Sequence, residues 1–104
     1  MMTIIKTHAI TAGEDLRDFI TSLIENRLAK YGDKITKAEV HLADENGSKG
    51  GDSDKRCLIE VHAAGLEPVV VKEYAHTVAD ALNGATQKLD AALESRIGKM
   101  KEHR

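Results

Sequence analysis

The residues of this 104-residue chain best suited to chemistry are basic side chains near its C-terminus. They are Arg96, Lys99, Lys101 and Arg104. Glu102 is the single acid among them, and His103 can add positive charge. Such cations bind nucleic-acid phosphates, with a steep dependence on salt. A solvated helix end explains the same pattern, because cations stabilise the C-terminal end of the helix dipole, and composition alone favours this second interpretation.

Two histidines, His41 and His62, occupy outward positions on two predicted strands. A metal site built on them would need a further ligand such as Glu39 or Glu60. The spacing matches no recognised ligand pattern, so we expect no metal site and interpret both residues as histidines of an exposed sheet face.

The single cysteine, Cys57, alternates with Ile59 and Val61, which predicts a small buried side chain rather than a nucleophile. One cysteine excludes an internal disulfide and a multi-cysteine zinc site. Residues 44–55 contain three glycines but no Gly-x-x-x-x-Gly-Lys-Ser/Thr motif for phosphate binding. With no nucleophile–base pair or metal constellation, we expect no enzyme, no cofactor and no small-molecule substrate.

The elements that must position these residues follow from the spacing of apolar side chains. Residues 3–8 are rich in β-branched side chains and predict a strand. Thr11 and Glu14 have the spacing of a capping box, and a helix is predicted to follow it and to end at Gly32. The apolar residues at helical spacing, all assigned to the core side, are Leu16, Phe19, Ile20, Leu23, Ile24, Leu28 and Tyr31.

The second half of the chain predicts three strands and a long helix. Alternation indicates strands around residues 38–42 and 57–63, and a third strand follows at 69–71. The polar segment at about 44–55 predicts a mobile loop. A helix from about Ala75 to near the C-terminus carries a narrow apolar stripe, Val78, Leu82, Ala85, Leu89 and Leu93. Arg96 continues that stripe, and an unpaired guanidinium is costly in an aliphatic core, so we expect the helix to leave the sheet near Leu93.

The predicted order is β-α-β-β-β-α, an α+β fold with a four-stranded sheet and two helices packed on one face, in a single domain at 1–104. Hydrophobic residues make up 41% of the chain, with one Phe and two Tyr, so the core must be aliphatic and few aromatic residues remain to stack on bases. No apolar run reaches the length of a membrane span and the first residues lack the apolar stretch of a signal peptide, so we expect a cytoplasmic protein. The net charge of −2 does not suggest a strongly basic nucleic-acid binder.

The βαβββα order fits a double-stranded-RNA-binding domain as well as a second family, and four segments favour the second. Residues 14–20, Glu-Asp-Leu-Arg-Asp-Phe-Ile, resemble its "E-x-L-R-x-Phe/Tyr-Val/Ile" helix start, and residues 30–35 resemble the exit into its second strand. Residues 81–89 resemble "A-I-D-x-x-x-D-K-L", and 99–101 match a trailing Lys-x-Lys. In this joint order the chain resembles the short form of the ribosome hibernation-promoting factors, or ribosome-associated translation inhibitors.

That resemblance implies a stress-response protein that binds the small ribosomal subunit in the channel for mRNA and tRNA and blocks translation. Basic side chains would contact rRNA phosphates, through backbone and shape rather than through base recognition. The expected rRNA-binding residues are Arg17, Lys88, Arg96, Lys99, Lys101 and Arg104. Ala91, Ser95 and Ile97 stand where the family commonly has Arg or Lys, and Asn83 replaces its usual Asp.

The alternative is a protein-interaction module with the same fold that has lost ribosome binding. The net charge of −2 and the missing basic positions support it. Such a module would pair with itself or with a partner through the uncovered sheet face or the edge strand at 69–71. Salt separates the two hypotheses, because a ribosome complex weakens steeply with added salt whereas strand pairing does not.

Overall fold

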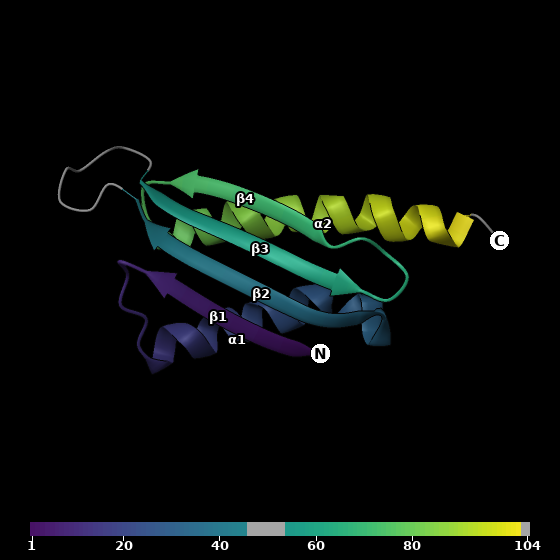
Figure 1. Cartoon of the computed structure of the whole chain (residues 1–104), viewed down its shortest axis with the longest axis horizontal. Coiled ribbons are helices and arrows are strands. Elements are labelled where there is room, and N and C mark those ends of the chain that lie inside the picture. Colours follow the sequence, from purple (N-terminus) through teal and green to yellow (C-terminus); the bar gives the residue numbers. More distant parts are fainter. Residues whose placement is uncertain (46–53, 103–104) are drawn as a thin grey trace.

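The computed structural model describes the backbone of residues 1–45 and 54–102 and the side chains of residues 1–45 and 54–98. In chain order its elements are β1 (Met2–His8), α1 (Glu14–Leu28), the 3₁₀ helix η1 (Ala29–Lys34), β2 (Ile35–Asp44), β3 (Lys55–Ala63), β4 (Val69–Ala75) and α2 (Val78–Glu102). Both helices lie behind one face of a single sheet (Figure 1). The predicted α+β class and βαβββα order are therefore confirmed.

The sheet has the order β1-β2-β3-β4, with β1 parallel to β2 and the other pairs antiparallel. Its register aligns Ile5 with Val40, Val40 with Ile59 and Ile59 with Val71. Side chains along a strand alternate between its two faces, so this row and its even-spaced neighbours point toward the helices. The intervening residues form the opposite face, which none of the described helices and strands covers (Figure 1).

The core is aliphatic, as the composition predicts. The helices contribute Ile20, Ile24, Leu28, Leu82, Ala85, Leu89, Leu93 and Ile97, each at most 2% exposed. The central strands contribute Ala38, Val40, Leu42, Cys57, Ile59 and Val61. Burying a side chain of this size stabilises the fold by about 1.5–3 kcal/mol, so this one core determines which face of each element turns inward.

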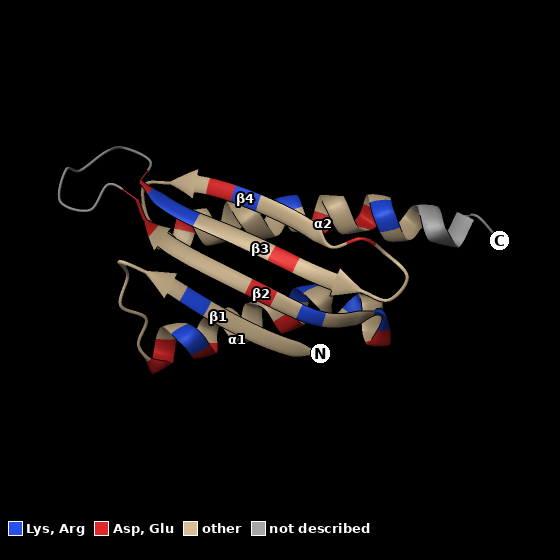
Figure 2. Cartoon of the chain, viewed as in Figure 1, with Lys and Arg blue, Asp and Glu red and all other residues tan. Residues whose placement is uncertain are grey.

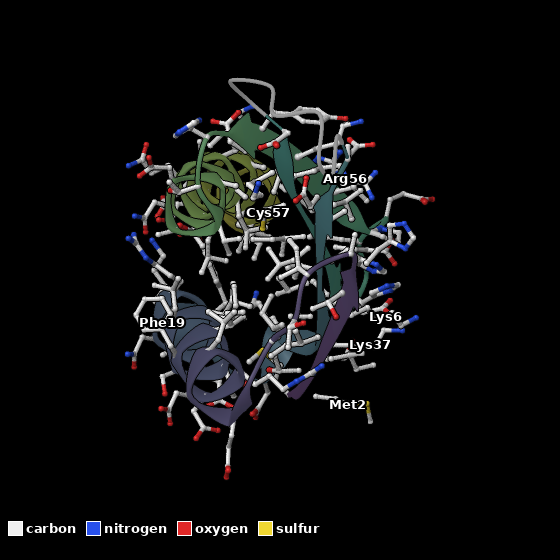
Figure 3. All side chains as sticks on the ribbon, turned by 90° about the vertical axis from the view of Figure 1, so that its left-hand side faces the viewer. Met2, Lys6, Phe19, Lys37, Arg56 and Cys57 are labelled. Carbon is white, nitrogen blue, oxygen red and sulfur yellow. The ribbon has the colours of Figure 1, made fainter. Side chains whose placement is uncertain are left out.

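The first helix differs from its prediction in its cap, its end and one core residue. Gly13 is the N-cap, without a side-chain cap hydrogen bond, so Thr11 does not form the predicted capping box. The α-helix ends at Leu28 and continues as η1, where Gly32 adopts a φ of 58°. Phe19 is 55% exposed and points away from the sheet (Figure 3). The stripe of Ile20, Ile24 and Leu28 faces the sheet instead, because residues four apart share one helix face.

The second helix also differs from its prediction at both ends. It begins at Val78, where the Thr77 hydroxyl accepts a hydrogen bond from the Asp80 backbone N–H at 3.1 Å, a cap that the sequence analysis missed. The prediction that it leaves the sheet near Leu93 is wrong, since Ile97 is 2% exposed. Ile97 lies four residues beyond Leu93 on the same face, whereas Arg96 is rotated outward and exposed.

The predicted loop at about 44–55 is shorter than expected at both ends. Asp44 is the last residue of β2 and Lys55 the first of β3. The prediction of a mobile loop falls on residues 46–53, which lie outside the described residues.

Candidate nucleic-acid interface

Two of the predicted phosphate-binding residues lie at opposite edges of the sheet. Arg17 donates from Nε to the Ala12 carbonyl at 3.2 Å and from a terminal nitrogen to the Ile5 carbonyl of edge strand β1 at 3.3 Å. Lys88 donates to the Lys72 carbonyl of edge strand β4 at 2.9 Å. The four strands between them span about 14 Å, from the usual strand spacing. Arg17 and Lys88 therefore do not form one patch, and each holds a backbone oxygen of an edge strand.

Lys88 has a second partner that depends on close packing of α2 against β4. Its Nζ lies 3.1 Å from Oε1 of Glu73. A Cβ atom at Gly84 would lie 2.5 Å from the other oxygen of that carboxylate, so a larger residue there would push the Glu73 side chain aside. The positive charge of Lys88 is thus largely balanced by an acid on the neighbouring strand.

The remaining predicted residues follow on α2. Arg96 is exposed and makes no hydrogen bond or ion pair within the described side chains. Lys99 and Lys101 lie in the last turns of α2, but their side chains lie outside the described residues, as does the whole of Arg104. Three of the six predicted residues have described side chains, and among these Arg96 can bind a phosphate without losing a partner.

Two further cations of the helix layer, which comprises α1, η1 and α2, pair with acids of α2. Arg27 of α1 pairs with Asp90 of α2 at 2.7 Å, and Lys30 pairs with Glu94. Burial raises the pKa of Tyr31 beside this bridge, while Lys30 acts to lower it. These cations stabilise the packing of the helices and are not free for an external anion.

The uncovered side of the sheet, here called the open face, carries a different arrangement of charge. Its outward positions are Met2, Ile4, Lys6, His8, Lys37, Glu39, His41, Ala43, Arg56, Leu58, Glu60, His62, Val70, Lys72 and Tyr74. Figure 2 shows this face, with basic residues on all four strands. Four of its residues are Lys or Arg and two are acidic, whereas the whole chain has 15 Lys and Arg against 17 Asp and Glu. The open face is therefore positive on a negative protein.

Glu39 lies between two of these cations. Lys6 Nζ is 3.5 Å from its Oε1, and Lys37 Nζ is 3.6 Å from its Oε2. Figure 3 shows Lys6 and Lys37 on the side of the sheet away from the helices. Burial acts to raise the pKa of Glu39, but the ammonium groups of Lys37 and Lys6 outweigh it and lower the pKa. The Glu39 carboxylate is therefore ionised at neutral pH, and Lys6 and Lys37 share its one negative charge.

Glu39, Glu60 and His62 form a compact group next to these lysines. Their donor atoms all lie within 4.8 Å of one another, and His62 Nε2 is 2.6 Å from Glu60 Oε2. His41 is not opposite His62, because the register aligns His41 with Leu58. A divalent cation here would stand beside two ammonium groups, so this donor set favours ion pairing over metal binding.

The loop end of the open face combines a guanidinium with an aromatic ring. Arg56 and Tyr74 are opposite each other on β3 and β4. Arg56 Nε lies 3.9 Å from the Glu45 carboxylate, a separation too long for a hydrogen bond. A hydrogen bond to Glu45 raises the pKa of Tyr74, and Lys72 Nζ lies 5.7 Å from the centre of its ring. This corner holds two of the four cations of the open face and one exposed aromatic ring, with the Glu45 carboxylate beside them.

Sequence reasoning identified His41 and His62 as outward but did not include the basic residues of this face among the phosphate contacts. The signal was present, because Lys37 alternates with buried Ala38, and Arg56 and Lys72 precede or follow inward residues. What the sequence could not supply was the strand register that gathers Lys6 and Lys37 around one carboxylate.

The chain that carries these surfaces has a known fold. It is similar to the N-terminal domain of Thermus thermophilus Protein Y, with a TM-score of 0.73 and 17% identity over 91% of this chain and 98% of that one. It is also similar to a ribosomal subunit interface protein from Coxiella burnetii, with a TM-score of 0.73 and 14% identity over 94% of this chain and 99% of that one. At these identities the likeness shows a shared fold.

The family is shown by sequence. Residues 3–101 match the family described as sigma 54 modulation protein / S30EA ribosomal protein, and the chain belongs to that family. No curated protein matches the sequence. The resemblance to ribosome hibernation factors is confirmed, and with it a ribosome-associated modulation factor as the class of protein. This class is not known as a family of enzymes. Within residues 1–45 and 54–102, no helix is long and apolar enough to cross a membrane.

Proposed function

We propose that this protein binds the small ribosomal subunit in the cytoplasm, occupies the channel for mRNA and tRNA, and lowers translation under stress by steric exclusion. The observation that carries the proposal is the family match over residues 3–101, nearly the whole chain. The shared fold supports it, because the chain covers 98% of the Protein Y domain. Exclusion needs no chemistry, which suits a surface of ion pairs and aliphatic side chains.

The proposed contacts are rRNA phosphates. The residues assigned to them are Arg17, Lys88, Arg96, Lys99, Lys101 and Arg104. Arg96 is exposed and needs no rearrangement to bind, while Arg17 and Lys88 would have to share or exchange their present partners. Phosphate contacts position a protein on RNA without recognising sequence, which agrees with the small number of aromatic residues.

The alternative is an interaction module that pairs through its sheet face or an edge strand, and its edge-strand form has less support. On β1 the Ile5 carbonyl accepts a hydrogen bond from Arg17, and on β4 the Lys72 carbonyl accepts one from Lys88. Charged side chains over the edges of a sheet oppose the addition of a further strand. A strand-pairing partner would have to displace both cations, so the two edges are poorly suited to such an interface.

The direct test of the contact residues is a triple charge reversal, Lys99→Glu, Lys101→Glu and Arg104→Glu, with binding measured on purified small subunits. We expect affinity to fall by about hundredfold or more at moderate salt, because three attractive phosphate contacts become repulsive. Lys34→Glu, an exposed reversal in η1, is the control and is expected to change binding much less. Circular dichroism of each variant checks the fold. Unchanged binding in the triple variant would remove the end of α2 from the mechanism.

A further inference from the structure

The two oxygens of Glu39 are each held by a different ammonium group on the open face. Lys6 comes from β1 and Lys37 from β2, at 3.5 and 3.6 Å. Only 14% of the Glu39 side chain is exposed, while Lys6 is 61% and Lys37 35% exposed. A carboxylate between two exposed lysines offers one anionic oxygen to each ammonium group, as a phosphate with two free oxygens does. Glu39 therefore gives these two lysines the kind of anionic partner that a phosphate would give them.

The rest of the open face extends the positive charge across the sheet. Lys6, His41, Leu58 and Lys72 form one row from β1 to β4 in the register. With the usual strand spacing, the lysines at the two ends of this row are about 14 Å apart. Arg56 and Tyr74 lie in the next outward row toward the loop end. An extended polyanion can contact both rows, whereas a single small anion cannot.

We propose that the open face is a second contact surface for the RNA backbone, and that Glu39 limits its strength by competing with phosphate for Lys6 and Lys37. The inference rests on the proposed function, since a protein of a ribosome-associated family meets rRNA as its abundant polyanion. The charge of the face is complementary to that partner. Val70 and Tyr74 lie between or beside the cations and are about half exposed, so they offer apolar surface to the sugars and bases of a bound strand.

The test is Glu39→Gln, a variant that should gain binding and is therefore not explained by misfolding. Affinity is measured for a labelled single-stranded oligouridylate and for purified small subunits, each at several salt concentrations. We expect Glu39→Gln to bind both about two- to tenfold more tightly than wild type, because two surface ion pairs no longer compete. The slope of log affinity against log salt should steepen by about 0.7, since Gln removes one carboxylate charge and frees about one lysine charge, which releases about 0.7 counterion on a single strand.

Glu25→Gln is the matched control, because Glu25 is exposed on α1 and its loss changes the net charge equally. A second control places Glu39→Gln in a Lys6→Gln, Lys37→Gln background, where the gain should disappear. Equal affinities of Glu39→Gln, Glu25→Gln and wild type would overturn the inference, as would an equal gain in both Glu variants.

The two ligands separate this inference from the proposed function. A gain on oligouridylate with no binding of wild type to small subunits would support the open face and contradict the proposed function. Binding of wild type to small subunits with no selective gain for Glu39→Gln on either ligand would support the proposed function and overturn the inference.

Discussion

The helix layer and the open face use similar numbers of cations in opposite ways. On the helix layer, Arg27 of α1 and Lys30 of η1 each have their own acidic partner on α2, and Lys88 has Glu73 on β4. On the open face, Lys6 and Lys37 share the one carboxylate of Glu39. The difference lies in how the charge is balanced, with one acid for each of these cations on the helix layer and one acid for two lysines on the open face.

This comparison changes the meaning of the net charge. A total of −2 suggests a poor nucleic-acid binder only when charge is spread evenly. Here the acids gather on the helices and at the loop end, while the open face keeps an excess of cations (Figure 2). Because a Debye length at physiological salt is about 8 Å, a bound strand responds mainly to the face that it touches.

The largest expected effect comes from a substitution in the core, which supports both the helix layer and the open face. Leu89→Ala should reduce the free energy of unfolding by about 2–5 kcal/mol, because Leu89 is fully buried between α2 and the sheet and its loss leaves a cavity. Urea denaturation measures the change. Leu58→Ala on the half-buried open face is the matched control and should cost less than half as much. Equal losses would contradict the assignment of the two sheet faces.

A second prediction compares the same two faces by thiol chemistry. Burial raises the pKa of Cys57 to about 12, so at about pH 8 the native protein should react with a thiol reagent at least a hundredfold more slowly than after unfolding. In a Cys57→Ala background, Leu58→Cys places the thiol on the open face and should react rapidly. Prompt labelling of native Cys57 would contradict its burial.

The raised pKa of Cys57 also has a consequence for stability. The native thiol keeps its proton above the pH at which the unfolded thiol ionises, so the unfolded state binds fewer protons there. Its contribution to the free energy of unfolding is fully present below about pH 8.5 and is lost as pH rises toward about 12. The part of the loss that comes from the thiol should be absent in Cys57→Ser, because the serine hydroxyl does not titrate in that window.

The smallest expected effect concerns the ion pairs of the helix layer. Asp90→Asn should lower the free energy of unfolding by about 0.2–1 kcal/mol, because the Arg27–Asp90 pair is partly exposed and screened. Chemical denaturation at low and high salt measures it, and the difference should shrink at high salt. A loss that is large and independent of salt would show that the pair does more than bridge exposed helix surfaces.

Most of the fold followed from the period of apolar residues, because alternation and helical spacing each select one face of an element. The predictions were wrong where two adjacent residues of a helix both fitted the apolar spacing and only one could face the core. Phe19 fits the helical period yet is exposed, since Ile20 and Ile24 take the inward face. Arg96 lies on the extension of the stripe of α2, but Ile97 completes it. Local spacing does not settle which of two adjacent residues turns inward at the end of a stripe.

The candidate surfaces were less predictable, because they depend on register and on partners distant in sequence. Arg17 and Lys88 were identifiable as cations, but their bonds to carbonyls of β1 and β4 required the packed fold. Glu39 and Lys37 are two residues apart on one strand, a spacing visible in the sequence. The approach of Lys6 depends on the parallel pairing of β1 with β2.

The measurement that tests the central claim most directly is co-sedimentation of the wild-type protein with ribosomes through a sucrose gradient, at about 50 and 200 mM salt. Electrostatic binding to rRNA predicts that the protein migrates with the small subunit at the lower salt and is largely released at the higher. A protein that stays at the top of the gradient at both salts would contradict ribosome binding, and one that comigrates equally at both would contradict binding through phosphate contacts.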